Sequence, residues 1–240
     1  MLSVCIPCYK EAENLEVLLP RLKQCLNEAD IEAEIILMDT MEPMDNTCDV
    51  CSKFSSSAEI VTVRYMQREG GNNYGDAIRT IFSKAQGNMI IIMDADGSHA
   101  PEDCVKLYKT MQNGNYDIVI GSRYIKGGKT DNPFILVFMS YVLNISYRLF
   151  FRLNVSDVSD SFRIYKSEIV KGLNLQCENF DVVEEILIKA NLNKSLNIKE
   201  IPIVFNKRMY GESKRDLFRF ILSYIGTIKK LKKIQRAAKK

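Results

Sequence analysis

The sequence predicts an α/β protein in which a mostly parallel central sheet is flanked by helices on both faces. Two observations support this fold class. Short apolar, β-branched runs alternate with segments of helical periodicity over the first half of the 240-residue chain. The runs also lack the polar alternation of half-exposed strands, as expected for parallel strands that are covered on both faces.

Five apolar runs are the predicted strands. They are LSVCIP (2–7), EIILMD (34–39), EIVTVRYM (59–66), NMIIIMDAD (88–96) and YDIVIGSR (116–123). Between the first two, leucines recur near a 3.6-residue period and predict an amphipathic helix. These leucines are Leu15, Leu18, Leu19, Leu22 and Leu26. Pro20 lies within the same stretch and is a candidate kink.

The second half contains two apolar segments of a different kind. Residues 133–153, PFILVFMSYVLNISYRLFFRL, approach the length of a membrane span, but serine, asparagine and arginine interrupt them. This pattern fits a buried helix or a helix lying in a membrane interface. A later segment, FRFILSYIGTI, runs into the basic end of the chain and is a candidate second surface helix.

The basic residues are concentrated at the end of the chain. Residues 217–240 contain eight Lys or Arg and no Asp or Glu, whereas the whole chain has a net charge of only +3. The tail is therefore either a solvated helix end or a segment attracted to anionic lipid. The remaining chain is net acidic and shows no recognised nucleic-acid motif, so we do not expect a nucleic-acid partner.

The cysteines and the N-terminal sequence predict a reducing, cytoplasmic environment. The seven cysteines are an odd number for a disulfide framework, and Met1 runs directly into a strand-like segment rather than a signal peptide. Two pairs, Cys5 with Cys8 and Cys48 with Cys51, have CxxC spacing. In a strand, side chains at i and i+3 point to opposite faces, so we expect buried thiols at Cys5 and Cys8 rather than a zinc or redox site.

The ends of the predicted strands indicate one binding crevice. Ligands of open parallel sheets bind beyond the carboxyl ends of the strands. The residues at the ends of these runs or just after them are Pro7, Tyr9, Asp39, Asp94, Asp96 and Arg123. No GxGxxG motif opens the first helix and no GxxxxGK[ST] motif occurs, so neither a Rossmann dinucleotide site nor a P-loop is supported.

Asp94 and Asp96 are the most informative pair. They are two residues apart, so both would point to one side of an extended strand end. Adjacent carboxylates repel each other unless a cation lies between them, and hard oxygen ligands suit Mg²⁺ or Mn²⁺ that also bridges substrate phosphates. The alternative is that Asp94 only ends the strand or caps the following helix.

Four segments together resemble glycosyltransferase family 2, which has the Rossmann-like GT-A fold. They are MDADGSHAPE, VCIPCYKEAENL, NNYGDAIR before AQGN, and YDIVIGSRY. The chain is most similar to the dolichyl-phosphate mannose synthase and polyprenyl-phosphate glycosyltransferase branch, because a His and a Pro-Glu follow MDAD and because SDSFRIY and FNKRMYGESK appear downstream. The resemblance covers residues 2 to about 216. It implies a catalytic domain over 1–216, which includes 133–153, and a basic amphipathic helix or tail over 217–240.

The resemblance also implies roles for individual residues. Those expected at the nucleotide sugar are Pro7, Tyr9, Glu11, Asp39, Asp94, Asp96 and Arg123. Those expected at the metal are Asp94, Asp96 and Ser98. The catalytic candidates are Asp96, Arg123, Arg208 and Lys214, with Ser213 in the same tail motif.

The chain departs from the family's usual wording at three points. MDTMEPMDNT stands where a double Asp and GSxDGT are usual, so guanine and uracil both remain open as the base. Ser161 replaces a usual glycine, which is expected to change how closely an acceptor phosphate approaches the backbone. Gly97 replaces a usual leucine and predicts a looser metal loop.

The resemblance implies an inverting, Mg²⁺- or Mn²⁺-dependent transfer of a mannose- or glucose-class hexose. The donor would be GDP-mannose or a UDP-hexose, and the acceptor a polyprenyl or dolichyl phosphate at the cytoplasmic face of a membrane to which the protein binds peripherally. A phosphate is already anionic at neutral pH and needs no strong base, so His99, the single histidine, is expected to orient neighbouring groups.

Two other functions remain open from the sequence. The first is a transferase of the same fold that acts on a sugar hydroxyl and uses Glu184, Glu185 or Asp160 as its base. The second is a non-catalytic protein that binds nucleotide sugars at a membrane surface.

Overall fold

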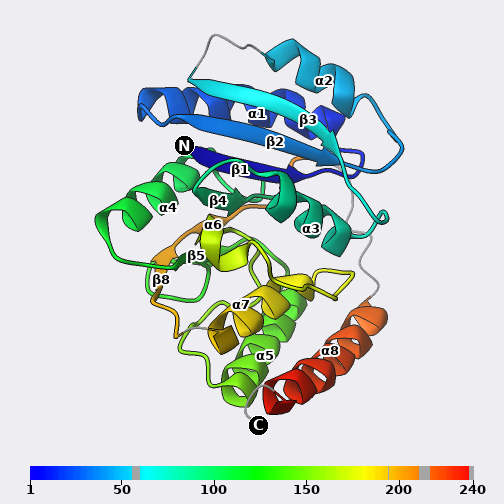
Figure 1. Ribbon diagram of the computed structural model, residues 1–240, viewed down its shortest axis with the longest axis vertical. Coiled ribbons are helices and arrows are strands. Elements are labelled where there is room, and N and C mark those ends of the chain that lie inside the picture. Colours follow the sequence, from blue (N-terminus) through cyan, green and yellow to red (C-terminus); the bar gives the residue numbers. More distant parts are fainter. Residues whose placement is uncertain (56–59, 194, 211–216, 238–240) are drawn as a thin grey trace.

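The computed structural model describes residues 1–55, 60–193, 195–210 and 217–237. Within this part of the chain, seven strands form one sheet in the order β3-β2-β1-β4-β7-β5-β8 (Figure 1). Their bounds are β1 Leu2–Pro7, β2 Ala33–Asp39, β3 Val61–Gln67, β4 Met89–Ile92, β5 Ile118–Ser122, β7 Arg163–Lys166 and β8 Ile198–Pro202. A short parallel pair, β6 (Lys129–Thr130) and β9 (Val204–Phe205), lies outside this sheet.

The sheet is mostly parallel, as the sequence predicts. β1 pairs in parallel with β2 and β4, β2 with β3, and β5 with β8. All five predicted strands are present. The exception to the parallel pattern is β7, which the sequence analysis does not predict and which lies antiparallel between β4 and β5.

Helices cover both faces of the sheet (Figure 1). Their bounds are α1 Ala12–Glu28, α2 Thr47–Phe54, α3 Tyr74–Lys84, α4 Pro101–Asn113, α5 Phe134–Phe151, α6 Ser167–Val170, α7 Val182–Asn193 and α8 Leu217–Ala237. The five leucines of the predicted first helix are all buried, and α1 continues through Pro20, which lies on its exposed side.

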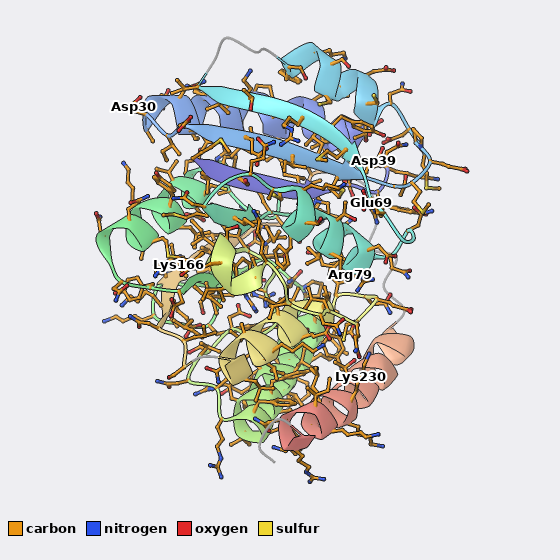
Figure 2. The ribbon with its side chains drawn as sticks, in the orientation of Figure 1. Asp30, Asp39, Glu69, Arg79, Lys166 and Lys230 are labelled. Atoms are coloured by element: carbon orange, nitrogen blue, oxygen red, sulfur yellow. The ribbon has the colours of Figure 1, made fainter. Side chains whose placement is uncertain are left out.

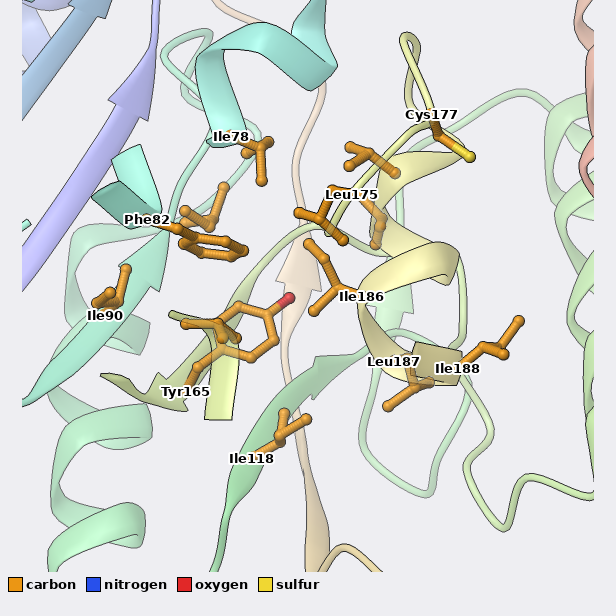
Figure 3. Close-up of a cluster of buried hydrophobic side chains, with 14 of the residues drawn as sticks. Ile78, Phe82, Ile90, Ile118, Tyr165, Leu175, Cys177, Ile186, Leu187 and Ile188 are labelled. Atoms are coloured by element: carbon orange, nitrogen blue, oxygen red, sulfur yellow. The ribbon is translucent and has the colours of Figure 1, made fainter. Parts of the chain in front are cut away.

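Side chains that alternate along the strands form two hydrophobic clusters, one on each face. In β2, Ile36 and Met38 belong to the cluster that includes α3 and α7, whereas Ile35 and Leu37 belong to the cluster of α1, α2 and α4. Figure 3 shows the first cluster, in which Phe82 of α3 lies against Tyr165 of β7 with ring centroids 5.9 Å apart.

The CxxC pairs follow the same alternation. Cys5 belongs to the α3 and α7 cluster and Cys8 to the α1 cluster, which confirms that the two side chains point to opposite faces. All seven cysteines fall in the described residues and are free thiols.

Helix α5 corresponds to the apolar stretch 133–153 and has a narrow buried side. Asn144, Tyr147 and Phe151 are buried, whereas much of the helix surface is apolar and exposed. The exposed side chains are Phe134, Ile135, Phe138, Tyr141, Val142, Ile145, Leu149 and Phe150. In the part of the chain that is described, α5 is the one helix long and apolar enough, by length and composition, to cross a membrane.

The tail forms helix α8, which packs against α5 and α7 at the end of the molecule away from α2 (Figure 1). Because only a narrow side of α5 is buried, this stretch is not a helix enclosed in the core.

Candidate active site

A cleft of about 880 Å³ opens beside the loops that follow β1 and β4. Several of the candidate residues line it together, and these are Pro7, Tyr9, Glu11, Asp94, Asp96 and Arg208. The cleft therefore lies beyond the carboxyl ends of two adjacent parallel strands, where open α/β sheets bind their ligands.

The loop after β1 supplies one wall of the cleft. Asn14 donates a hydrogen bond from Nδ2 to Glu11 Oε2 at 2.6 Å, and the Ala12 N–H donates to Asp45 Oδ2 at 3.0 Å. Burial raises the pKa of the Glu11 carboxyl, and the charges of Asp96 and Asp94 act in the same direction. These three carboxylates therefore create a negative potential in the cleft that favours a cation.

The loop after β4 contains both aspartates. β4 ends at Ile92, so Asp94 and Asp96 lie in a loop rather than at the extended strand end that the sequence suggests. The Ser98 N–H donates to Asp96 Oδ1 at 3.0 Å, and the Arg208 guanidinium donates to Asp96 Oδ2 at 2.9 Å. The Ser161 hydroxyl donates to Asp94 Oδ1 at 3.1 Å. Both carboxylates still line the same cleft.

His99 joins the aspartate loop to the segment before β7. Its Nδ1 accepts the Asp94 N–H at 3.0 Å, so the proton lies on Nε2, which donates to Asp160 Oδ1 at 3.1 Å. The imidazole is buried and stacks on Phe162 with ring centroids 4.5 Å apart. His99 therefore lies behind the aspartates and bonds the backbone of Asp94, which is the placement expected of a residue that orients its neighbours.

Arg123 is buried behind the cleft. Its guanidinium makes a bidentate contact to Asp157, with Nε and Nη2 each 2.7 Å from a carboxylate oxygen, and Nε lies 3.1 Å from Asp160 Oδ2. Burial opposes ionisation of Asp160, but Arg123 and His99 hold its pKa low, at about 2. Arg123 is not among the residues that line the cleft, so the structure does not bring it to the position expected for a phosphate ligand.

Asp39 also lies away from the cleft lining. Figure 2 shows it at the same edge of the sheet as Glu69, opposite Asp30. Its carboxylate is fully buried and accepts the Thr40 N–H at 2.8 Å and the Tyr65 hydroxyl at 2.9 Å. In this arrangement its oxygens stabilise the end of β2 and are not part of the cleft lining.

Arg68 is a cleft residue that the sequence analysis missed. It follows β3 directly, and its buried guanidinium donates to the backbone carbonyls of Asp39, Asn72, Asn73 and Cys8. It thereby ties together the ends of three neighbouring strands. Its position at the end of the VTVRYMQR run is the signal that could have identified it, by the same rule that selected Arg123.

Three further candidates have less defined places. Ser98 Oγ is buried and has no hydrogen-bond partner among the described residues. Ser213 and Lys214 lie outside the described residues.

Tyr74 and Phe180, which stack with centroids 4.4 Å apart, also line the cleft and were not selected from the sequence.

The aspartate loop fits a hard divalent cation. Asp94 and Asp96 present oxygens to one cleft, and the buried Ser98 hydroxyl beside them lacks a partner in the described structure. The described residues contain no group of three or more His, Cys, Asp or Glu that would hold an ion by itself. An ion here would share ligands between the protein and substrate phosphates, as Mg²⁺ commonly does.

Comparison with known proteins identifies the family. The model of "Glycosyl transferase family 2" matches residues 3–173. The dolichol-phosphate mannosyltransferase of Pyrococcus furiosus is 35% identical over 216 residues, which are 88% of this chain and 58% of that protein. The undecaprenyl-phosphate mannosyltransferase of Micrococcus luteus is 30% identical over 217 residues, which are 87% of this chain and 85% of that protein.

Solved structures show the same fold. Glucosyl-3-phosphoglycerate synthase from Mycobacterium tuberculosis, in complex with UDP, superposes with a TM-score of 0.72 at 16% identity, over 97% of this chain and 80% of that one. Its complex with Mn²⁺ and UDP-glucose also gives a TM-score of 0.72, over 96% of this chain and 78% of that one. Because the family model and both mannosyltransferases match most of the sequence, the chain belongs to glycosyl transferase family 2 and has its GT-A type α/β fold.

Proposed function

We propose that this protein transfers a hexose from a nucleotide-diphosphate sugar to the phosphate of a polyprenyl lipid. The observation that carries the proposal is the convergence of Asp94, Asp96 and Arg208 on one cleft beside the loop after β1. The two relatives named as polyprenyl-phosphate mannosyltransferases support a lipid phosphate as the acceptor and mannose as the sugar.

The side chains of the cleft suit a diphosphate leaving group. Asp94 and Asp96 would hold Mg²⁺ or Mn²⁺, which supplies positive charge to the diphosphate as it departs. Arg208 offers a planar guanidinium fork beside the same carboxylates and would bind phosphate oxygens. Tyr9, nearly half exposed at the cleft, provides an aromatic surface for the nucleotide.

The proposed reaction is a single displacement with inversion. An oxygen of the acceptor phosphate forms a bond to the anomeric carbon, while the bond from that carbon to the diphosphate oxygen breaks and its electron pair leaves with the diphosphate. The attacking phosphate is already ionised at neutral pH, so no protein base has to remove a proton. The protein contributes alignment and charge stabilisation.

The alternative hydroxyl acceptor requires a base in the cleft. The three candidates for that role, Glu184, Glu185 and Asp160, do not line it. Glu184 is fully buried, Glu185 accepts the backbone N–H groups of Gln176 and Cys177, and Asp160 contacts Arg123 and His99. This placement favours an acceptor that is already anionic.

Helices α5 and α8 support peripheral attachment to a membrane as part of the same proposal. The exposed apolar side chains of α5 would enter the boundary between headgroups and acyl chains. Lysines on the exposed side of the adjacent α8, such as Lys229, Lys230 and Lys233, would face anionic lipid. Figure 2 shows Lys230 on α8. We propose the cytoplasmic face of the membrane as the location.

A transfer assay tests the proposed function. Purified protein is incubated with GDP-mannose or UDP-glucose and Mn²⁺, with polyprenyl phosphate or the matching polyprenol as acceptor. We expect a glycosylated lipid only with the phosphate acceptor, and none after EDTA or with Asp96→Asn. Transfer to polyprenol would favour the hydroxyl reaction, and tight nucleotide binding without turnover of any donor would favour the non-catalytic alternative.

A further inference from the structure

The segment after β9 docks on the aspartate loop through three polar contacts. Two are backbone hydrogen bonds, from the Asn206 N–H to the Ser98 carbonyl at 2.9 Å and from the Met209 N–H to the Asp96 carbonyl at 2.9 Å. A third contact is the ion pair of Arg208 with Asp96 Oδ2. Residues 206–210 therefore lie along the loop that carries both proposed metal ligands.

Gly97 leaves the space into which the side chain of Met209 packs, and this contact is called the seat of the segment. It has a φ of +79°, and a Cβ atom at this position would lie 2.6 Å from Cε and 2.8 Å from Cγ of Met209. The methionine side chain therefore occupies the space that any other residue at 97 would fill. The loop is not simply loosened by its glycine, as expected from the sequence, because Met209 packs directly against it.

The ion pair has a consequence for cation binding at the aspartates. Asp96 accepts the Ser98 N–H on one oxygen and Arg208 on the other. A guanidinium at this distance repels a second cation and competes for the same carboxylate. The backbone on both sides of Arg208 is bonded to the aspartate loop, through Asn206 and Met209, and the Met209 side chain packs on Gly97, so the guanidinium is kept close to Asp96.

We propose that residues 206–210 form a clasp, seated by Met209 on Gly97, which keeps Arg208 on Asp96 as an internal counter-cation and thereby sets the affinity of the aspartate pair for a divalent cation. This inference rests on the proposed function in so far as Asp94 and Asp96 bind the cation. Met209 is then a positioning residue, because it acts on the metal site through Arg208.

The test uses variants that leave the charge of the site unchanged. Met209→Ala removes the seat, and Met209→Leu preserves an apolar side chain of similar volume. The matched control is Met41→Ala, because Met41 is another surface methionine, 48% exposed against 39% for Met209, and does not line the cleft. Asp96→Asn reports which part of any cation binding depends on the proposed site.

Two measurements are made on the full chain. Binding of Mn²⁺ in the presence of GDP or UDP, followed by electron paramagnetic resonance and corrected for the Mn²⁺ that the nucleotide binds without protein, should be about threefold to tenfold tighter in Met209→Ala, because the competing state is less populated. Trypsin cleavage after Lys207 or Arg208, identified by mass spectrometry, should be faster in the same variant. Met209→Leu and Met41→Ala should match the unsubstituted protein in both measurements.

Gly97→Ala provides an independent check. It should open the clasp as Met209→Ala does, and the double variant should cleave no faster than either single one, because both substitutions remove the same contact. Asp96-dependent Mn²⁺ binding of equal strength in Met209→Ala and Met41→Ala would overturn the clasp and leave the proposed function intact. A lack of any Asp96-dependent binding, with faster cleavage of Met209→Ala, would instead contradict the metal site of the proposed function and confine the clasp to a structural role.

Discussion

His99 Nδ1 lies 3.0 Å from the backbone nitrogen of Asp94 and accepts its hydrogen bond. The other ring nitrogen lies 3.1 Å from Asp160, which itself contacts the buried guanidinium of Arg123. The backbone of the first aspartate is thus connected through one imidazole to an ionic cluster behind the cleft. This connection predicts that His99 positions Asp94 without touching substrate.

Replacement of His99 by Asn and by Gln separates its two hydrogen bonds. An Asn side chain can still present an acceptor near the Nδ1 position, whereas a Gln side chain reaches toward the Nε2 position and the Asp94 contact is lost. We expect kcat of His99→Gln to fall by about tenfold to a hundredfold through misplacement of Asp94, with a smaller loss in His99→Asn. Steady-state kinetics at saturating donor and Mn²⁺ measure this split. Equal losses in both variants, in proportion to lost stability, would argue against positioning.

Replacement of Ser161 is expected to change the Mn²⁺ concentration that the protein requires rather than its maximal rate. Its hydroxyl orients the Asp94 carboxylate, and Ser161→Ala removes that hydrogen bond without adding volume. We expect the Mn²⁺ concentration for half-maximal activity to rise by about threefold to tenfold, which corresponds to about 1 kcal/mol for one hydrogen bond. Ser52→Ala, at an exposed serine that bonds only within its own helix, should show no change. An unchanged Mn²⁺ requirement in Ser161→Ala would remove this residue from the site.

The buried carboxyl of Glu184 is expected to make the free energy of unfolding depend on pH. Burial raises the pKa of its carboxyl to about 8, whereas in the unfolded chain it titrates near its ordinary value of about 4.3. Between these two pH values the folded protein binds the extra proton, so its free energy of unfolding falls as pH rises, by up to about 1.4 kcal/mol per pH unit, and levels off above pH 8.

Glu184→Gln removes this decline because glutamine does not titrate. Urea unfolding at pH 5, 6.5 and 8 should show that the variant gains stability relative to the unsubstituted protein as pH increases. Glu28→Gln, at an exposed position on α1, is the control and should parallel the unsubstituted protein. Parallel curves for Glu184→Gln would mean that the carboxyl is ionised in the folded state.

Much of the fold follows from local sequence patterns. The apolar runs mark the five predicted strands because most of them are buried on both faces, with β3 at the sheet edge partly exposed, and the leucine period marks α1 because one side of that helix faces the sheet. Strand β7 is different. This segment, Arg163–Lys166, has only four residues, and its first residue is charged. It forms a strand only by pairing with β4 and β5, which come from distant parts of the chain. Such pairing has no local signature.

In the candidate site, too, some residues can be predicted from local sequence and others depend on distant contacts. Strand order alone selects Asp94 and Asp96, because both follow β4 at the edge where β1 also ends. Arg123 and Asp39 follow strands too, but their orientation depends on Asp157 and Tyr65, which lie 34 and 26 residues away. The packing of Met209 against Gly97 likewise brings together two segments that are far apart in the sequence and share no motif.

Membrane attachment through α5 predicts that a single acidic substitution releases the protein from vesicles. Phe138→Glu or Leu149→Glu places a charge on the exposed apolar side of α5, and binding to vesicles of phosphatidylcholine and phosphatidylglycerol should fall by at least about tenfold. Val17→Glu, at a similarly exposed apolar residue of α1, is the control and should bind normally. Flotation at low salt measures the bound fraction, and equal flotation of all three variants would exclude α5 as the contact.

The proposed reaction depends on Asp94 and Asp96 holding a divalent cation against a nucleoside diphosphate. The most direct measurement is the anomalous scattering of crystals grown with Mn²⁺ and GDP or UDP. We expect one manganese peak bounded by oxygens of both carboxylates and of the diphosphate, with the nucleotide lying toward Tyr9 and Glu11 in the same cleft. A nucleotide bound in this cleft with no manganese near either aspartate would contradict this expectation.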